Sequence, residues 1–350
     1  MRHQVTRASQ EVFPIRHSKP SAAREYNSLP RFCKFLKRSF AVMVSNSEIT
    51  SWCVVYGIEA FFIVLGNGLA AVVFLTCKSL HRRTYSLLAS LAVADFLVGA
   101  LAAPMFIAVL AQYYGWMSFD KHLGGAQRTI EILTSYASIV TLTMIALERL
   151  VAVIAPLRHA TESKSSYVSA ISLSWVIAIL MASLSLLRDY HMAAGKAVFV
   201  ILMVVMIICM VITCVSYSAI AVLLHKYNQS TFSSSHPERS KRERNLVTTL
   251  FIASVVFIVT WLPFQVLNWI FFFEPNSALS GHYIYVSKFL HFLNSLVNPV
   301  VYIFRMPEFR QGIREICRCY DETKRNEENA PPIGMDGSHY NPTVTEQGFI

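Results

Sequence analysis

Charged residues are scarce in this chain. Asp, Glu, Lys and Arg together make up 15% of its 350 residues, whereas hydrophobic residues make up 54%. The mean hydropathy of +0.44 lies well above that of ordinary soluble proteins. This composition argues against a soluble globular protein and predicts an integral membrane protein.

Disulfide and catalytic frameworks are also missing. No loop between two apolar stretches contains a cysteine, which argues against an outer surface held together by disulfides. We find no phosphate-binding loop, DNA-reading module, nucleophile–base spacing or His-Glu-His cluster. We therefore expect neither an enzyme nor a nucleic-acid partner. The net charge of +10 is explained by membrane-flanking loops and a basic leader.

Residues 1–51 form a basic N-terminal segment, with nine Lys or Arg residues before Met43. The segment lacks the uninterrupted apolar core of a secretory signal, and seven apolar stretches downstream argue against a transit peptide. Basic flanks tend to stay cytoplasmic, so this segment fits an extracellular location poorly. We therefore leave both Met1 and Met43 open as the native start.

Seven apolar stretches follow, each longer than the roughly 20 residues that a membrane-spanning helix needs. Isolated strands would leave backbone groups unpaired in lipid, so the stretches must be helices. We predict an all-α membrane protein with a seven-transmembrane helix bundle over residues 52–305. The stretches are about 52–77, 84–110, 122–154, 167–187, 193–225, 244–273 and 282–304.

The loops on the two sides of this bundle differ in positive charge. Thirteen Lys or Arg residues follow the odd-numbered stretches, whereas three lie in the opposite loops. Because loops rich in Lys and Arg stay cytoplasmic, we predict a multi-pass plasma-membrane protein with its N-terminus outside and its C-terminus inside.

The segment after the last stretch predicts a short amphipathic helix over residues 306–319, with Phe309 and Ile313 on its apolar face. Cys317 and Cys319 at its end are either palmitoylation sites or free thiols. Residues 320–350 are polar, so we predict a disordered cytoplasmic tail.

Each apolar stretch carries a short motif, and together the motifs resemble those of the rhodopsin-like (class A) G-protein-coupled receptors. The resemblance covers about residues 52–319. It implies a ligand-activated receptor that passes an extracellular signal to heterotrimeric G proteins, with membrane lipids around it. The motifs are Gly66-Asn67, Leu91-Ala92-Val93-Ala94-Asp95, Glu148-Arg149-Leu150, Ala155-Pro156-Leu157, Trp175, Tyr217, Phe257-Thr260-Trp261-Leu262-Pro263 and Asn298-Pro299-Val300-Val301-Tyr302.

Several polar residues lie in the middle of these apolar stretches. Unpaired polar groups are costly there, so we expect them to contact one another. An oxygen-only shell suits an alkali ion better than a transition metal, and the resemblance implies an allosteric sodium site. The alternative is a hydrogen-bonded water network, and no other cofactor is expected. The residues are Asn67, Asp95, Ser138, Asn294, Ser295 and Asn298.

Eighteen residues separate Glu131 from Arg149 in the third stretch, about 27 Å of helix. We expect Arg149 to pair with Glu148 and with Glu243. By resemblance, the contact with Glu243 is a resting-state latch, although Glu243 could instead be a solvated charge. The remaining switch residues are the kink-forming Pro263, Pro299, and the tyrosines placed to receive the freed arginine, Tyr217 and Tyr302.

Glu131 stands where amine receptors carry an aspartate that pairs with the ligand. Arg128 and Lys288 add two cations, and Trp261 and Phe264 add an aromatic floor. Together with an apolar fifth stretch, this set fits an amphiphile with an anionic or zwitterionic head, such as a lysophospholipid. A peptide or an amine stays open. Glu131 could instead pair with Lys288 across the bundle, with Glu59 in the first stretch as a rival partner for the lysine.

The chain also departs from the family pattern. Gly124 and Cys209 replace a usual cysteine and proline, and the second outer loop is short, similar to melanocortin, lysophospholipid and cannabinoid receptors. Lys288 raises the alternative of a retinal-binding photoreceptor, but opsins place their lysine where Phe292 stands here. A seven-helix transporter or channel is a further alternative, although we see neither internal repeats nor broken helices.

Overall fold

A computed structural model describes residues 46–77, 83–118, 120, 122–161, 163–190, 195–230, 237–274 and 281–328. Both candidate start residues and residues 329–350 of the predicted tail lie outside this range. The described chain is almost entirely helical. Its elements are α3 (Asn46–Thr76), α4 (Arg83–Leu97), the π-helical η2 (Val98–Ala102), α5 (Ala103–Tyr113), α6 (Leu123–Ile154), α7 (Pro156–Thr161), α8 (Lys164–Tyr190), α9 (Gly195–Ser230), α10 (Pro237–Phe273), α11 (Gly281–Arg305) and α12 (Pro307–Glu328).

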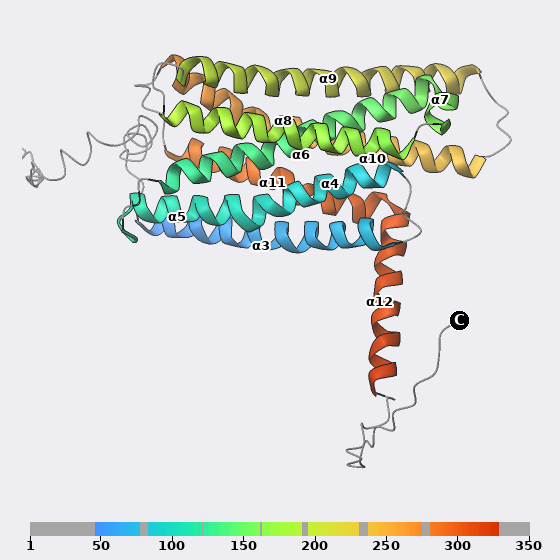
Figure 1. Ribbon diagram of the computed structural model, residues 1–350, viewed down its shortest axis with the longest axis horizontal. Helices are drawn as coiled ribbons and strands as arrows, with labels where there is room; N and C mark the ends of the chain where they lie inside the picture. The colour runs from blue at the N-terminus through green and yellow to red at the C-terminus, as the bar shows by residue number, and fades with distance from the viewer. Residues whose placement is uncertain are drawn as a thin grey trace, which may run out of the picture.

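These elements form a seven-helix bundle, in which α4, η2 and α5 together make the second long helix (Figure 1). In the described residues, six helices are long and apolar enough to cross a membrane. The remaining member, α11, packs on α10 and α3. Its buried face carries polar residues such as Lys288, His291 and Asn294, which lower its mean hydropathy.

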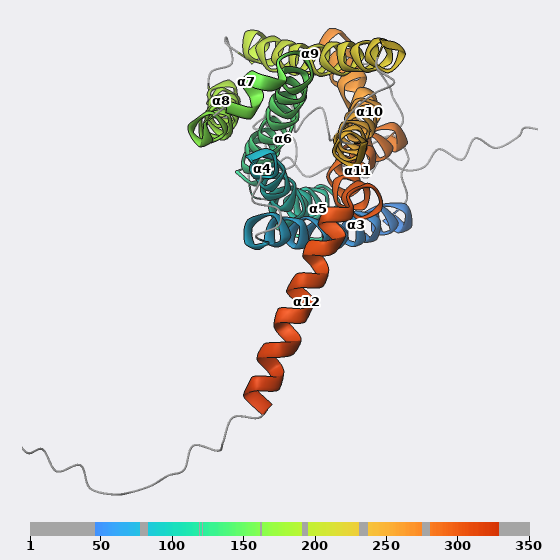
Figure 2. The same cartoon turned by 90° about the vertical axis from the view of Figure 1, so that its right-hand side faces the viewer.

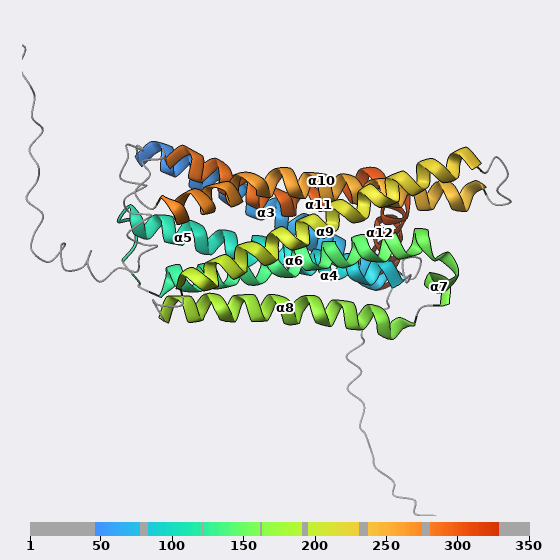
Figure 3. The ribbon, with the colours of Figure 1, turned by 90° about the horizontal axis from the view of Figure 1, so that it is seen from above.

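Helix α6 packs on α4, α8 and α9. Viewed along the bundle, α8 lies outside the ring of the other helices and packs on α6 (Figure 2). In the most apolar 18-residue segment of α6, 56% of the residues are buried. In the corresponding segments of α8 and α9, 22% are buried. The large side chains exposed on these outer helices, such as Ile179 and Val211, therefore face lipid. Figure 3 shows α8 along one edge of the bundle, with α7 at its end.

The second span contains a π-helical turn that the sequence did not predict. A Cβ at Gly99 would lie 2.8 Å from Cγ2 of Ile63 and 2.9 Å from the carbonyl oxygen of Ala60. Glycine thus lets η2 approach α3 closely. This is the point at which the backbone hydrogen bonds of the second span change from the α-helical to the π-helical spacing.

Helix α12 leaves the bundle at a steep angle (Figures 1 and 2). Phe309 anchors its first turn, fully buried, with its ring centroid 5.3 Å from that of Phe74 and 5.8 Å from that of Tyr302. The helix continues beyond the predicted end at Cys319 to Glu328, so the start of the segment predicted as disordered is helical.

Candidate functional site

A buried ion pair joins α6 to α11 near the end of the bundle where α6 begins. Glu131 and Lys288 are 8% and 7% exposed, and Lys288 Nζ donates a hydrogen bond to Glu131 Oε1. Gln127, one turn earlier on α6, donates from Nε2 to Glu131 Oε2 at 2.6 Å. The structure thus contains the cross-bundle pair, one of the arrangements that the sequence left open.

Three aromatic rings surround the ammonium group of Lys288. Its Nζ lies 5.0 Å from the ring centroid of Phe106, 4.6 Å from that of Phe264 and 5.6 Å from that of Phe292. A cation in contact with several ring faces is attracted by their quadrupoles, and more strongly when water is excluded. The carboxylate and the rings therefore form an ammonium-binding site, which the chain's own lysine fills.

His291 connects this site to Trp261. Its Nε2 lies 3.4 Å from Glu131 Oε1, and its ring centroid is 4.3 Å from that of Trp261. His291 is 3% exposed. The sequence analysis missed this residue, although its position one helical turn after Lys288 on the same face was a usable signal.

Two further charged residues lie buried in this half of the bundle. Arg128, one turn before Glu131 on α6, is 9% exposed. Glu59 on α3 is 4% exposed, and neither carboxylate oxygen has a hydrogen-bond partner among the described residues. Lys288 therefore pairs with Glu131 and not with Glu59, which corrects the rival pairing considered from the sequence.

Asp95 on the second span lies at the centre of a polar cluster. Its Oδ1 accepts hydrogen bonds from Ser138 Oγ at 3.2 Å and Ser295 Oγ at 2.9 Å, and its Oδ2 accepts one from Asn298 Nδ2 at 2.7 Å. Asn67 Nδ2 donates to the carbonyl oxygen of Ser295 at 2.8 Å, while its buried Oδ1 has no partner among the described residues.

This cluster provides oxygen ligands and no sulfur or imidazole ligand. Asn294, the sixth member of the predicted set, is buried on α11 at 4% exposure. In the described part of the chain, no group of three or more His, Cys, Asp or Glu residues could hold a metal ion. The donor set therefore fits a small alkali cation better than a transition metal.

At the opposite end of α6, Arg149 donates from Nε and Nη2 to the Glu148 carboxylate. Glu148 Oε1 also lies 2.6 Å from His159 Nε2 and accepts a hydrogen bond from Tyr167 Oη at 2.9 Å. The sequence analysis missed these two partners. The side chain of Glu243 lies outside the described residues, so its pairing with Arg149 stays a prediction.

The other predicted switch residues lie on α9, α10 and α11. Tyr217 and Tyr302 are 3% and 1% exposed, and the Tyr302 hydroxyl has no hydrogen-bond partner in the described chain. Pro263 lies inside α10, and Pro299 lies inside α11. A Cβ at Gly66 would lie 3.1 Å from the Pro299 ring, so the glycine allows α3 to pack closely on α11. On α12, Cys317 is exposed, whereas the side chain of Cys319 lies outside the described residues.

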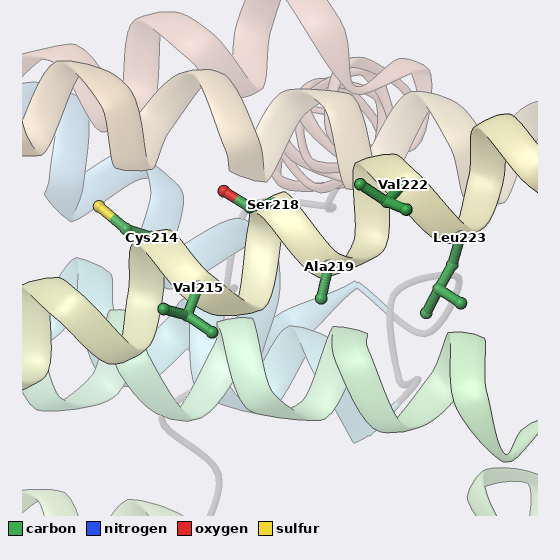
Figure 4. A pocket seen from close by; sticks show the side chains of 6 residues that line it. All are labelled: Cys214, Val215, Ser218, Ala219, Val222 and Leu223. Carbon is green, nitrogen blue, oxygen red and sulfur yellow. The ribbon is translucent and has the colours of Figure 1, made fainter.

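A groove also runs along α9 (Figure 4). Its lining contains no charged residue, and Val215 and Val222 are 60% and 53% exposed. The groove therefore faces the lipid and is a poor candidate for a polar ligand. Its lining residues are Cys214, Val215, Ser218, Ala219, Val222 and Leu223.

Comparison with known proteins places this geometry in context. Residues 66–302 match the family model described as 7 transmembrane receptor (rhodopsin family). Mouse (Mus musculus) trace amine-associated receptor 8c is 30% identical over 294 residues, 75% of this chain and 84% of the relative. Mouse trace amine-associated receptor 7f is 28% identical over 290 residues, 74% of this chain and 80% of the relative. Rat (Rattus norvegicus) somatostatin receptor type 4 is 27% identical over 303 residues, 81% of this chain and 77% of the relative.

Proposed function

Because the chain belongs to the rhodopsin family of seven-transmembrane receptors, we propose that its ligand is a small primary amine whose ammonium group replaces that of Lys288 at Glu131. Family membership makes the protein a ligand-activated G-protein-coupled receptor and a multi-pass membrane protein. The observation that carries the ligand proposal is the Lys288 ammonium group itself. It is held by a carboxylate and three rings, as an amine ligand would be.

An amine ligand can replace Lys288 without leaving the Glu131 carboxylate unpaired. Removing one partner of a buried ion pair costs about 3–5 kcal/mol, because the other charge is left uncompensated. An incoming primary ammonium restores both the charge and the N–H donors that Glu131 loses when Lys288 moves away. The names of the trace amine-associated relatives support the same ligand class.

A zwitterionic amphiphile is the second candidate, and Arg128 favours it. With Lys288, Arg128 gives this half of the bundle two buried cations on α6 and α11. An acidic head group would bind these cations, while an ammonium group on the same ligand would bind Glu131.

A nucleotide-exchange assay on membranes that contain the receptor and a G protein separates the two candidates. We expect primary amines with an apolar body to stimulate exchange, whereas lysophospholipids of matched chain length do not. Arg128→Gln provides the matched variant, since it should leave amine responses within a few fold and abolish those to an anionic head group. Stimulation by lysophospholipids alone would contradict the amine proposal.

We also propose that the Arg149 end of the bundle faces the cytoplasm and the heterotrimeric G protein, with the receptor in the plasma membrane. The excess of Lys and Arg in the loops at that end supports this orientation. Leu157 in α7, 85% exposed at the same end, offers an apolar contact to a partner.

Finally, we propose that the Asp95 cluster holds an allosteric sodium ion in the resting state. The oxygen ligands would be the Asp95 carboxylate, the hydroxyls of Ser138 and Ser295, and the Oδ1 of Asn67, which has no hydrogen-bond partner among the described residues. Cys317, exposed on α12, is the proposed palmitoylation site.

A further inference from the structure

Helices α3 and α11 run side by side in a fixed register. Two hydrogen bonds join side chains of α3 to backbone carbonyls of α11, across sequence separations of 229 and 228 residues. The sequence separation between bonded residues hardly changes from one bond to the other. The two helices therefore run parallel and advance by the same length per residue. The bonds run from Tyr56 Oη to the Tyr285 carbonyl oxygen at 2.9 Å and from Asn67 Nδ2 to the Ser295 carbonyl oxygen at 2.8 Å.

In this register, Glu59 lies level with Lys288. Glu59 precedes the lysine by 229 residues, the same separation that the hydrogen bond between Tyr56 and Tyr285 spans. Glu59 belongs to the buried stripe of α3 that contains both hydrogen-bond donors. Two acids, Glu131 and Glu59, therefore lie buried in the half of the bundle that contains Lys288, and only Glu131 is paired with it in the described structure.

An acid without a partner is expensive inside a membrane bundle and is held there in its neutral form. The other titratable groups on the buried faces of the two helices near this level are Tyr56 on α3 and Tyr285, Lys288 and His291 on α11. The described buried residues that face α3 from η2 and α5 are apolar, among them Val98, Ala102 and Phe106. Nothing in the binding step described above uses Glu59.

We propose that Glu59 is the counter-ion that receives Lys288 when an amine ligand occupies Glu131. The inference rests on the proposed amine ligand and adds the fate of the displaced lysine. The flexible four-carbon stem of a lysine allows its ammonium group to change partners without a backbone shift. As the ammonium group arrives, Glu59 releases its proton to water. The net charge of the site stays constant: the ligand brings one positive charge and Glu59 becomes negative.

A double-mutant cycle tests this coupling through the affinity for one primary amine agonist, measured on wild type, Glu59→Gln, Lys288→Met and the double variant. In the wild-type background, Glu59→Gln should weaken binding by about tenfold, because the displaced lysine is left without an acid. With Lys288→Met, the same substitution should change affinity less than about twofold, since no lysine is displaced.

Two controls separate this role from a structural one. Glu59→Asp keeps the carboxylate and should retain most of the affinity, whereas Glu274→Gln removes an exposed acid at the end of α10 and should have no effect. If Glu59→Gln weakens amine binding equally in both backgrounds, the role of Glu59 as the acceptor of Lys288 is overturned. The amine ligand itself would still stand, because the variants bind it. Absence of amine binding in all variants would overturn the amine ligand and, with it, this inference.

Discussion

The imidazole ring of His291 on α11 lies against the indole of Trp261 on α10, with ring centroids 4.3 Å apart. On its other side, His291 Nε2 is 3.4 Å from Glu131 Oε1. Trp261 is two residues before Pro263, where the proline interrupts the hydrogen-bond ladder of α10. His291 thus contacts both Glu131, the proposed ligand-binding acid, and α10, the helix that contains the kink-forming Pro263.

We predict that His291→Ala uncouples binding from signalling. Loss of the ring should lower the maximal nucleotide exchange by severalfold. Agonist affinity should change less, because Glu131 and the three phenylalanine rings around the ammonium group remain. His291→Phe keeps the ring packing and should retain most of the response. Parallel binding and exchange measurements check this; equal loss of affinity in both variants would mean that His291 only shapes the pocket.

The Asp95 cluster predicts a sodium effect on agonist binding. If sodium stabilises the resting state through the Asp95 carboxylate, raising sodium should weaken agonist affinity in the wild type, whereas Asp95→Asn should be insensitive. Titration of agonist affinity with sodium, with potassium at equal ionic strength as the control, measures this. If sodium and potassium change the agonist affinity of the wild type equally, the Asp95 cluster is a hydrogen-bond network and not a sodium site.

Glu148 predicts a graded effect on the resting state. Its carboxylate accepts hydrogen bonds from Arg149 and from Tyr167. Glu148→Gln should release Arg149 and raise agonist-independent nucleotide exchange severalfold. Tyr167→Phe removes a single hydrogen bond to Glu148, worth about 1 kcal/mol, and should raise basal exchange less. Basal exchange normalised to receptor number tests the order of the two variants, and the opposite order would contradict this role for Glu148.

The packing of η2 on α3 predicts a stability difference between two glycines. Gly99→Val places side-chain atoms against Ile63 and the Ala60 carbonyl, so we expect destabilisation by about 1–3 kcal/mol. Gly57→Val is the matched control, since no atom lies within 4 Å of the position of its Cβ. Thermal unfolding in detergent compares the two, and equal melting temperatures would show that η2 is not closely packed.

Much of the architecture could be predicted from the sequence because lipid imposes length and composition on each span. The predicted ends of the third span, 122–154, nearly coincide with α6, since the change from apolar to polar residues marks the membrane boundary. The π-turn η2 could not be predicted, because it depends on the fit of Gly99 against another helix. The length of α12 was underestimated because its last turns are polar and gave no apolar signal.

The site was predicted in part for similar reasons. Glu131 and Lys288 stand out as charges within apolar stretches, but they lie 157 residues apart, and their pairing depends on how α6 and α11 are rotated. The packing of α5 and α11 brings Phe106 and Phe292 around the ammonium group, and no sequence spacing marks these rings among many other aromatic residues. His159 and Tyr167 reach Glu148 only through the turn that α7 makes at the end of the bundle.

The most direct test of the lysine-occupied amine site is the affinity of a primary amine agonist for Lys288→Met, compared with wild type and with Lys196→Met, which removes an exposed lysine on α9. Removing the internal competitor should tighten amine binding by about tenfold or more, because Glu131 is left without its buried partner. Lys196→Met should bind as the wild type does. Amine affinity that is unchanged or weaker in Lys288→Met would contradict the proposal that Lys288 occupies the ligand's place.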